Sequence, residues 1–207
     1  MPHTTYYPEP KVSKFLFASK FVAPFWTVVR IYLGWLWLNA GLHKVWVDGG
    51  FNPSWVGLGA GGSVSGYLNG ALARSQGDNP SVSGWYAWMI ENIFLPNAVI
   101  FSNLVAFGEV LIGLALILGF MTGLSAFLGG MMNASFLLAG TLSSNPVMFI
   151  LATWLVLAWR VAGYYGLDYF VLERIGAPAG FDFRTKRSVR KIGERVEQPA
   201  TGKADAR

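Results

Sequence analysis

Charged side chains within long apolar stretches are the residues of this sequence that point most clearly to chemistry. Arg30, Glu109 and Arg160 each interrupt such a stretch. Because a charge exposed to hydrocarbon costs several kcal/mol, residues of this kind normally face the interior of a helix bundle and have a partner. At about 1.5 Å of rise per helical residue, Glu109, Asn133, Arg160 and Arg30 lie about 16, 13, 20 and 24 Å from the outer boundary. We therefore expect Glu109 to accept hydrogen bonds from Arg30 or Arg160, with Asn133 in support.

This polar group has two interpretations. It is either a structural ion pair that fixes the register of the helices, or the polar lining of a site for a redox carrier or a proton path. In both cases, loss of one partner would leave a buried charge uncompensated.

His43 and Lys44 form a second candidate group near the outer end of the first apolar stretch. An imidazole there could hydrogen-bond a quinone carbonyl or transfer a proton, and the alternative is an interfacial side chain in contact with water. On a helical wheel, Asn39 lies on the same side as His43. The opposite side carries Arg30, Gly34, Trp37, Gly41 and Lys44. With polar residues on both sides, we expect this helix to be largely surrounded by protein.

The residue types exclude several cofactors. The sequence contains no cysteine, which rules out a disulfide framework and an iron–sulfur cluster held by its own thiolates. Of its two histidines, His3 lies in the polar N-terminal segment, so a bis-histidine haem within one chain is also ruled out. There is no glycine-rich phosphate loop and no nucleophile elbow. We expect no haem, metal or iron–sulfur cluster within one chain.

The composition indicates an all-α membrane protein. Of the 207 residues, 53% are hydrophobic and 13% are charged, which is roughly half the charge of a soluble protein. Four apolar stretches are long enough to be predicted as transmembrane helices. We place the spans at about residues 21–45, 98–120, 123–142 and 147–167. They form a four-transmembrane-helix bundle with an extended, glycine-rich outer loop between the first and second helices.

The distribution of basic residues predicts the orientation. Three lysines lie in segment 1–20 and nine lysines or arginines lie from Arg174 onward, whereas the outer loop carries Arg74. Under the positive-inside rule, both termini of this multi-pass plasma-membrane protein are cytoplasmic. The basic tail, 173–207, is expected to contact anionic lipid, with an RNA-binding arm as the less favoured alternative. Segments 1–20 and 173–207 thus flank a membrane domain over 21–172, and no nucleic-acid partner is expected.

Three stretches resemble the DoxX/DoxD family of small bacterial and archaeal membrane proteins. They are VRIYLGWLWLNAGLHKV in the first span, PNAVIFSNLVAFGEVLIGLALILGFMTG in the second, and NPVMFILATWLVLAWRVAGYYGLD in the last. The likeness covers about residues 24–172, and the long outer loop is more similar to the DoxD branch. The family's polar positions are matched by Arg30, Lys44, Glu109, Arg160 and Asp168.

The resemblance implies the membrane subunit of a quinone-linked oxidoreductase of the thiosulfate:quinone type, acting with a partner subunit in the bilayer. A quinone is then the expected bound electron acceptor. We expect Glu109 and Arg30 to shape a polar pocket, and His43 and Lys44 to contact the quinone head or an anionic substrate such as thiosulfate. The remaining binding candidates are Asn39, Asn133, Arg160 and Asp168.

Two further questions stay open at this stage. The rival function is a non-catalytic membrane scaffold or an assembly subunit of a larger complex, so enzymatic activity is not decided by the sequence. Homo-oligomers are also compatible with the glycine-rich helix faces. The haem–copper histidines of a terminal oxidase are missing, so we expect no electron transfer to oxygen by this chain alone.

Overall fold

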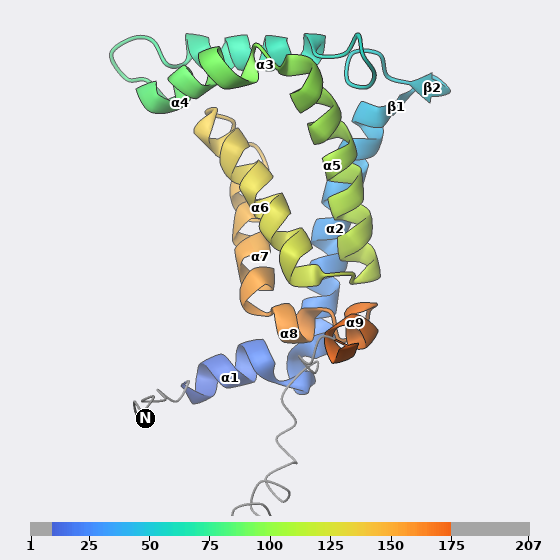
Figure 1. Cartoon of the computed structure of the whole chain (residues 1–207). Coiled ribbons are helices and arrows are strands. Elements are labelled where there is room, and N and C mark those ends of the chain that lie inside the picture. The colour runs from blue at the N-terminus through green and yellow to red at the C-terminus, as the bar shows by residue number, and fades with distance from the viewer. Residues whose placement is uncertain (1–9, 175–207) are drawn as a thin grey trace, which may run out of the picture.

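The computed structural model describes residues 10–174, whose regular elements are helices apart from one short hairpin. The four longest helices run side by side (Figure 1). They are α2 (Ala23–Val45), α5 (Ala98–Leu118), α6 (Thr122–Leu138) and α7 (Asn145–Leu157). Helix α5 packs most extensively on α2, and α6 on α7. The two pairs converge near the connection between α5 and α6 and separate toward the other end (Figure 1).

Short elements cover both ends of the long helices. At the end where the pairs separate lie β1 (Trp46–Val47), β2 (Gly50–Phe51), α3 (Gly62–Ala73), α4 (Gly84–Met89) and the π-helix η2 (Ile90–Phe94). The opposite end carries α1 (Lys11–Ala18), η1 (Lys20–Val22), α8 (Trp159–Ala162) and α9 (Asp168–Arg174). Strands β1 and β2 pair antiparallel. The first and last described elements therefore lie at one end, and the long connection between α2 and α5 lies at the other.

Two helical segments are long and apolar enough to cross a bilayer, which is consistent with a membrane protein. They are Lys20–Val45, with 26 residues, and Ala98–Leu118, with 21 residues. Helices α6 and α7 are apolar but contain 17 and 13 residues, fewer than the third and fourth predicted spans. Helix α6 ends early because Gly140 adopts a left-handed conformation, with φ of 77°. Helix α7 ends where the chain turns at Ala158 into α8.

Glycines allow α2 and α5 to pack with their backbones in contact. A Cβ atom on Gly34 would lie 2.9 Å from the carbonyl oxygen of Gly113, and one on Gly41 would lie 2.7 Å from the backbone nitrogen of Val110. Small residues favour such close approach between membrane helices. The predicted face of the first helix, with Arg30, Gly34, Trp37 and Gly41, is indeed buried.

The expectation that this helix is largely surrounded by protein is wrong for the described residues, because one of its faces is exposed. Tyr32, Trp35 and Leu42 are 53%, 57% and 45% exposed on its other side. Asn39 and His43 are exposed there as well. An outer face composed mainly of apolar side chains suits contact with lipid, and the two polar residues lie within three turns of the helix end, where water is close.

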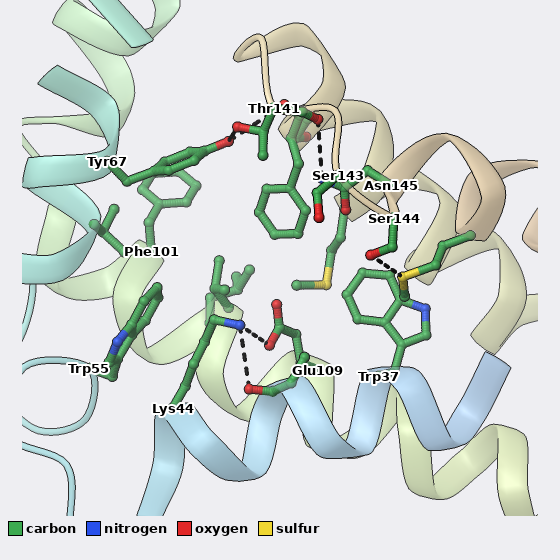
Figure 2. Close-up of a pocket in the computed structure, with 18 of the residues that line it drawn as sticks. Trp37, Lys44, Trp55, Tyr67, Phe101, Glu109, Thr141, Ser143, Ser144 and Asn145 are labelled. Atoms are coloured by element: carbon green, nitrogen blue, oxygen red, sulfur yellow. Dashed lines mark hydrogen bonds and ion pairs between the residues drawn. The ribbon is translucent and has the colours of Figure 1, made fainter. Parts of the chain in front are cut away.

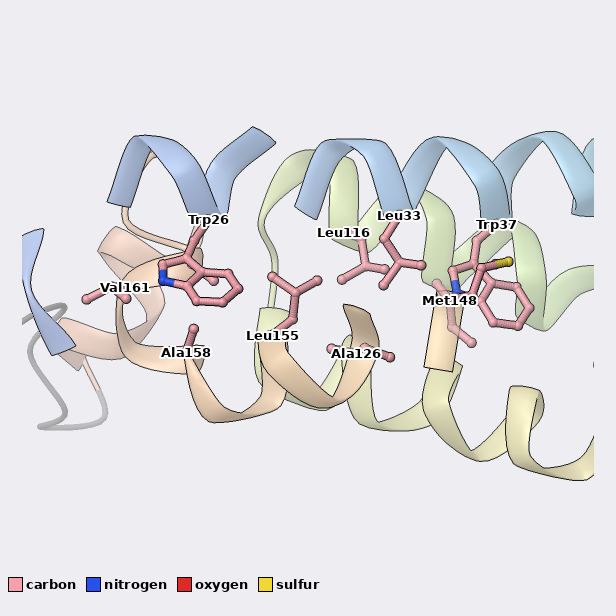
Figure 3. Close-up of a cluster of buried hydrophobic side chains, with 12 residues drawn as sticks. Trp26, Leu33, Trp37, Leu116, Ala126, Met148, Leu155, Ala158 and Val161 are labelled. Atoms are coloured by element: carbon pink, nitrogen blue, oxygen red, sulfur yellow. The ribbon is translucent and has the colours of Figure 1, made fainter. Parts of the chain in front are cut away.

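The main hydrophobic core lies where the helix pairs converge (Figure 3). Trp26 and Leu33 of α2 meet Leu116 of α5 and Leu155 of α7 there, each with at most 1% of its surface exposed. A second cluster, which includes Val64, Tyr86 and Ile90, joins α3, α4 and η2 to the N-terminal end of α5. Between these two clusters the helix pairs are far enough apart to leave an internal space.

Candidate functional site

A cavity of about 650 Å³ lies between the helix pairs, below α3 and α4. This volume is within the usual range of small-molecule binding sites. Side chains from α2, α3, α5, α6 and the connections between helices line it (Figure 2). Much of the wall is aromatic and comes from Trp37, Trp55, Tyr67, Phe101 and Phe136.

The charged part of the wall is an ion pair between Lys44 and Glu109. The ammonium nitrogen of Lys44 lies 2.5 Å from Oε2 of Glu109, and the two side chains are 22% and 2% exposed. The ammonium group also donates to the carbonyl oxygen of Ala40 at 3.4 Å and lies 5.3 Å from the ring centre of Trp55. Among the side chains that the structure describes between residues 10 and 174, Glu173 not being one of them, this is the one salt bridge.

The packing of α2 on α5 explains why these two residues meet. Gly41 is one turn before Lys44, and a Cβ atom there would lie 3.0 Å from Cβ of Glu109. The missing side chain thus lets α5 bring its carboxylate close to α2. The flexible lysine stem then spans the remaining distance along the helix.

The cavity also has a hydroxyl-rich wall, facing the ion pair across the open space (Figure 2). The hydroxyl oxygens of Tyr67 and Thr141 lie 2.9 Å apart, and Ser143, Ser144 and Asn145 continue this wall. Burial raises the pKa of Tyr67 above its ordinary value, so its phenol remains protonated at neutral pH. The cavity therefore presents neutral hydrogen-bonding groups opposite a charge-balanced pair.

The predicted pairing of Glu109 with Arg30 or Arg160 is wrong. The guanidinium of Arg30 donates instead to the carbonyl oxygens of Leu116, Ile117 and Tyr165, at 2.5, 3.0 and 3.3 Å. Arg160 is exposed in α8, with its guanidinium carbon 5.2 Å from the ring centre of Trp159.

The reason for this error is the register between α2 and α5. The depth estimate assumed that the end of α2 and the start of α5 lie at the same level of the membrane. In the structure, however, Gly41 near the end of α2 lies opposite Val110, which is well inside α5. The first turns of α5 therefore extend beyond the end of α2, and Glu109 lies close to the level of Lys44. Arg30 is 14 residues from Lys44 in the same helix, or about 21 Å away along its axis.

Asp168 also lies away from the cavity. Its carboxylate accepts the backbone N–H of Thr122 at 2.8 Å, and its own N–H donates to the carbonyl oxygen of Gly119 at 2.7 Å. Asp168 is 1% exposed. Together with Arg30 it holds the C-terminal end of α5, the start of α6 and the start of α9 in place, a structural role.

The other predicted residues have separate positions. Asn39 lines the cavity at an exposed place, whereas His43 lies outside the lining and pairs through Nδ1 with the carbonyl oxygen of Asn39, at 2.7 Å. Asn133 is fully buried beside the cavity and is not one of its lining residues. Within residues 10–174 neither polar atom of its side chain has a hydrogen-bond partner. Of the eight predicted site residues, the structure thus brings Asn39, Lys44 and Glu109 into one cavity.

Sequence reasoning missed several lining residues. Trp55 and Tyr67 belong to the long connection between α2 and α5, which was predicted as an extended, glycine-rich outer loop. Ser143 and Ser144 lie in the turn before α7, which begins at Asn145. The sequence contains no signal that this turn, so far away along the chain, faces Lys44 and Glu109.

The fold is consistent with an all-α membrane protein, and it contains a cavity of ligand size. The family model described as "TQO small subunit DoxD" matches residues 25–179. The chain therefore belongs to the DoxD family, whose members are membrane subunits of quinone-linked oxidoreductases. No curated protein matched the chain, and no solved structure did.

Proposed function

We propose that this protein is the membrane subunit of a thiosulfate:quinone oxidoreductase and that its internal cavity binds the quinone ring. The observation that carries the proposal is the placement of the Lys44–Glu109 pair in the wall of an aromatic cavity of about 650 Å³. A planar neutral ring suits such walls, because aromatic side chains stack on it or contact its edge.

The polar groups of the cavity suit the two carbonyl oxygens of a quinone. The ammonium of Lys44 is a donor for one of them, and the hydroxyl groups of Tyr67 and Thr141 are donors on the opposite wall. Reduction of a quinone to a quinol consumes two electrons and two protons. Lys44 holds a proton at Nζ within this cavity, and Glu109 keeps that ammonium in place.

The charges in the cavity suit a neutral quinone better than the thiosulfate anion. Lys44 is already paired with Glu109, and the carboxylate would repel an anion. A doubly charged thiosulfate ion is therefore poorly suited to this cavity, contrary to our expectation that Lys44 attracts it. We assign thiosulfate oxidation to the partner subunit, where two thiosulfate ions joining through a new sulfur–sulfur bond release the two electrons.

The proposal includes four crossings of the plasma membrane. The 17 residues of α6 span about 26 Å and the 13 residues of α7 about 20 Å, and α8 extends the fourth crossing. Tilt and local thinning of the bilayer accommodate helices shorter than its hydrocarbon layer. Both termini are then cytoplasmic, and α3 and α4 lie on the outer surface.

Quinone binding to the purified protein tests the proposal. Trp37 and Trp55 line the cavity, so a bound quinone should quench tryptophan fluorescence and yield a Kd. We expect Lys44→Met to weaken binding by about tenfold, since it removes a charged hydrogen-bond donor. The matched control Arg160→Met removes a charge outside the cavity and should change the Kd by less than about twofold.

The rival function gives a different result. A scaffold or assembly subunit would bind no quinone and, even with its native partners, would support no thiosulfate-dependent quinone reduction. The exposed Trp46, Phe51 and Leu58 at the outer end favour contact with a partner under either function. Quinone binding is therefore the discriminating measurement.

A further inference from the structure

The cavity opens on two sides of the long helices. Most of its lining residues are buried or partly buried, but five are exposed: Asn39, Leu104, Ser135, Ser143 and Ser144. Leu104 belongs to α5 and Ser135 to α6. Asn39 belongs to α2, and the two other serines precede α7. One opening therefore lies between α5 and α6, and the second between α2 and the start of α7.

Helix packing supports these two positions. Around the cavity, α5 contacts α6 and α2 contacts α7, but both contacts are less extensive than those within the pairs α2–α5 and α6–α7. On the α5–α6 side, a Cβ atom on Gly108 would lie 3.6 Å from the sulfur of Met132, so the helices touch there. Beyond this contact, toward α3 and α4, they separate (Figure 1). Leu104 and Ser135 lie in the separated part, one turn past the contact.

The two openings differ in polarity. At the α5–α6 opening, the exposed lining is Leu104, which is 56% exposed, and the single hydroxyl of Ser135. The outer surface around it is apolar, with Ile100 63%, Phe107 41% and Met131 55% exposed. Helix α5 is one of the two segments long enough to cross a bilayer, so this surface faces hydrocarbon. At the α2–α7 opening, the exposed lining consists of an amide and two hydroxyl groups.

We propose that the α5–α6 opening is the passage for the apolar tail of a membrane quinone, whose ring occupies the cavity. This inference rests on the proposed function. A tail that remains in hydrocarbon while the ring enters the protein needs an apolar opening at membrane depth. The polar α2–α7 opening would expose the tail to an amide and hydroxyl groups, and it serves as the route for water and protons.

The two exposed serines allow a matched test. Ser135→Phe narrows the α5–α6 opening, and Ser144→Phe adds the same bulk at the other opening. The Ser135 backbone carbonyl accepts a hydrogen bond from the hydroxyl of Tyr86 at 2.8 Å, and the substitution leaves this bond in place. Binding of a tail-less benzoquinone and of its decyl derivative is measured by tryptophan quenching for each variant and for the unchanged protein.

We expect Ser135→Phe to weaken binding of the decyl quinone by about tenfold and that of the tail-less quinone by less than about twofold. Unchanged binding of the tail-less quinone also shows that the variant is folded. For Ser144→Phe and for the small variant Ser135→Ala, we expect the ratio of the decyl-quinone Kd to the tail-less-quinone Kd to be the same as in the unchanged protein.

Three results would overturn the inference. If Ser144→Phe selectively weakens the decyl quinone, or if Ser135→Phe weakens both quinones equally, the tail does not pass between α5 and α6, and the quinone site itself still stands. If the unchanged protein binds neither quinone, the proposed function is wrong and this inference falls with it.

Discussion

The ion pair between Lys44 and Glu109 has its two members in different surroundings. Glu109 is 2% exposed, whereas the side chain of Lys44 is 22% exposed and retains a carbonyl oxygen and an aromatic ring as additional partners. Loss of the lysine therefore leaves a buried carboxylate without compensation, and loss of the glutamate leaves a partly solvated ammonium. The buried carboxylate of Glu109 therefore depends on Lys44 more than Lys44 depends on the carboxylate.

Substitutions of Glu109 and of Lys44, compared with each other, should reveal this asymmetry. Glu109→Gln keeps an oxygen that accepts from Lys44 and should cost about 1 kcal/mol of unfolding free energy, while Glu109→Ala should cost about 2–3 kcal/mol. Thermal unfolding in detergent measures both values. The double variant Lys44→Met/Glu109→Met should be more stable than Lys44→Met alone, since it leaves no uncompensated buried charge. A double variant that is less stable than both single variants would contradict the coupling of the two residues.

At the scale of elements, the α2–α5 contact determines the geometry of the site. Gly41 lies against the backbone of Val110, and the level of Glu109 follows from this contact. Gly108 faces α6 instead, with 3.6 Å between a Cβ atom placed there and the sulfur of Met132, an ordinary contact. These two glycines thus differ in the space available for a methyl group.

Alanine at each glycine should therefore have opposite effects. Gly41→Ala forces α2 and α5 apart and should destabilise the protein by about 1–3 kcal/mol, with weaker quinone binding because Lys44 and Glu109 separate. Gly108→Ala should be neutral or stabilising by up to about 1 kcal/mol, because alanine favours the helix. Unfolding temperature and quinone affinity are measured for both variants. Equal effects of the two substitutions would show that the α2–α5 approach does not control the site.

Sequence patterns predicted the helices that pack through glycine seams, and they did not predict how those helices align. The bounds of α2 and α5 agree with the first two predicted spans within two residues at each end, because hydrophobic length and small-residue spacing are local properties. The Arg30–Glu109 pairing was wrong because register depends on which glycine meets which backbone atom across the interface. The cavity could not be predicted, since Trp55, Tyr67 and Ser144 come together only through tertiary packing.

At the scale of the whole molecule, different short helices lie at the two ends of the long helices. Helices α1 and α9 lie at one end, and α3 and α4 at the other (Figure 1). The tail over residues 175–207, whose basic character predicted the orientation, lies outside the described residues. Orientation in the membrane is therefore best tested with residues at the two described ends.

The absence of cysteine from the sequence makes this test direct. Leu58 is 98% exposed in the outer connection and Val12 is 76% exposed in α1, so cysteine at either place should be accessible to a reagent. In intact cells, a membrane-impermeant maleimide should label Leu58→Cys and spare Val12→Cys. Cell lysis should make Val12→Cys reactive. The opposite pattern would invert the orientation, and labelling of both variants in intact cells would show that the two ends lie on the same side.

The hydrogen bonds of Arg30 have a consequence for how the chain is made. Its acceptors in α5 lie 86 and 87 residues later in the sequence, and the acceptor at Tyr165 lies 135 residues later. When α2 leaves the ribosome, no part of these acceptors has been synthesised. We therefore expect the newly made first helix to enter the bilayer with a guanidinium whose protein acceptors are missing until α5 arrives. A chain that stalls before that point keeps this guanidinium without those acceptors.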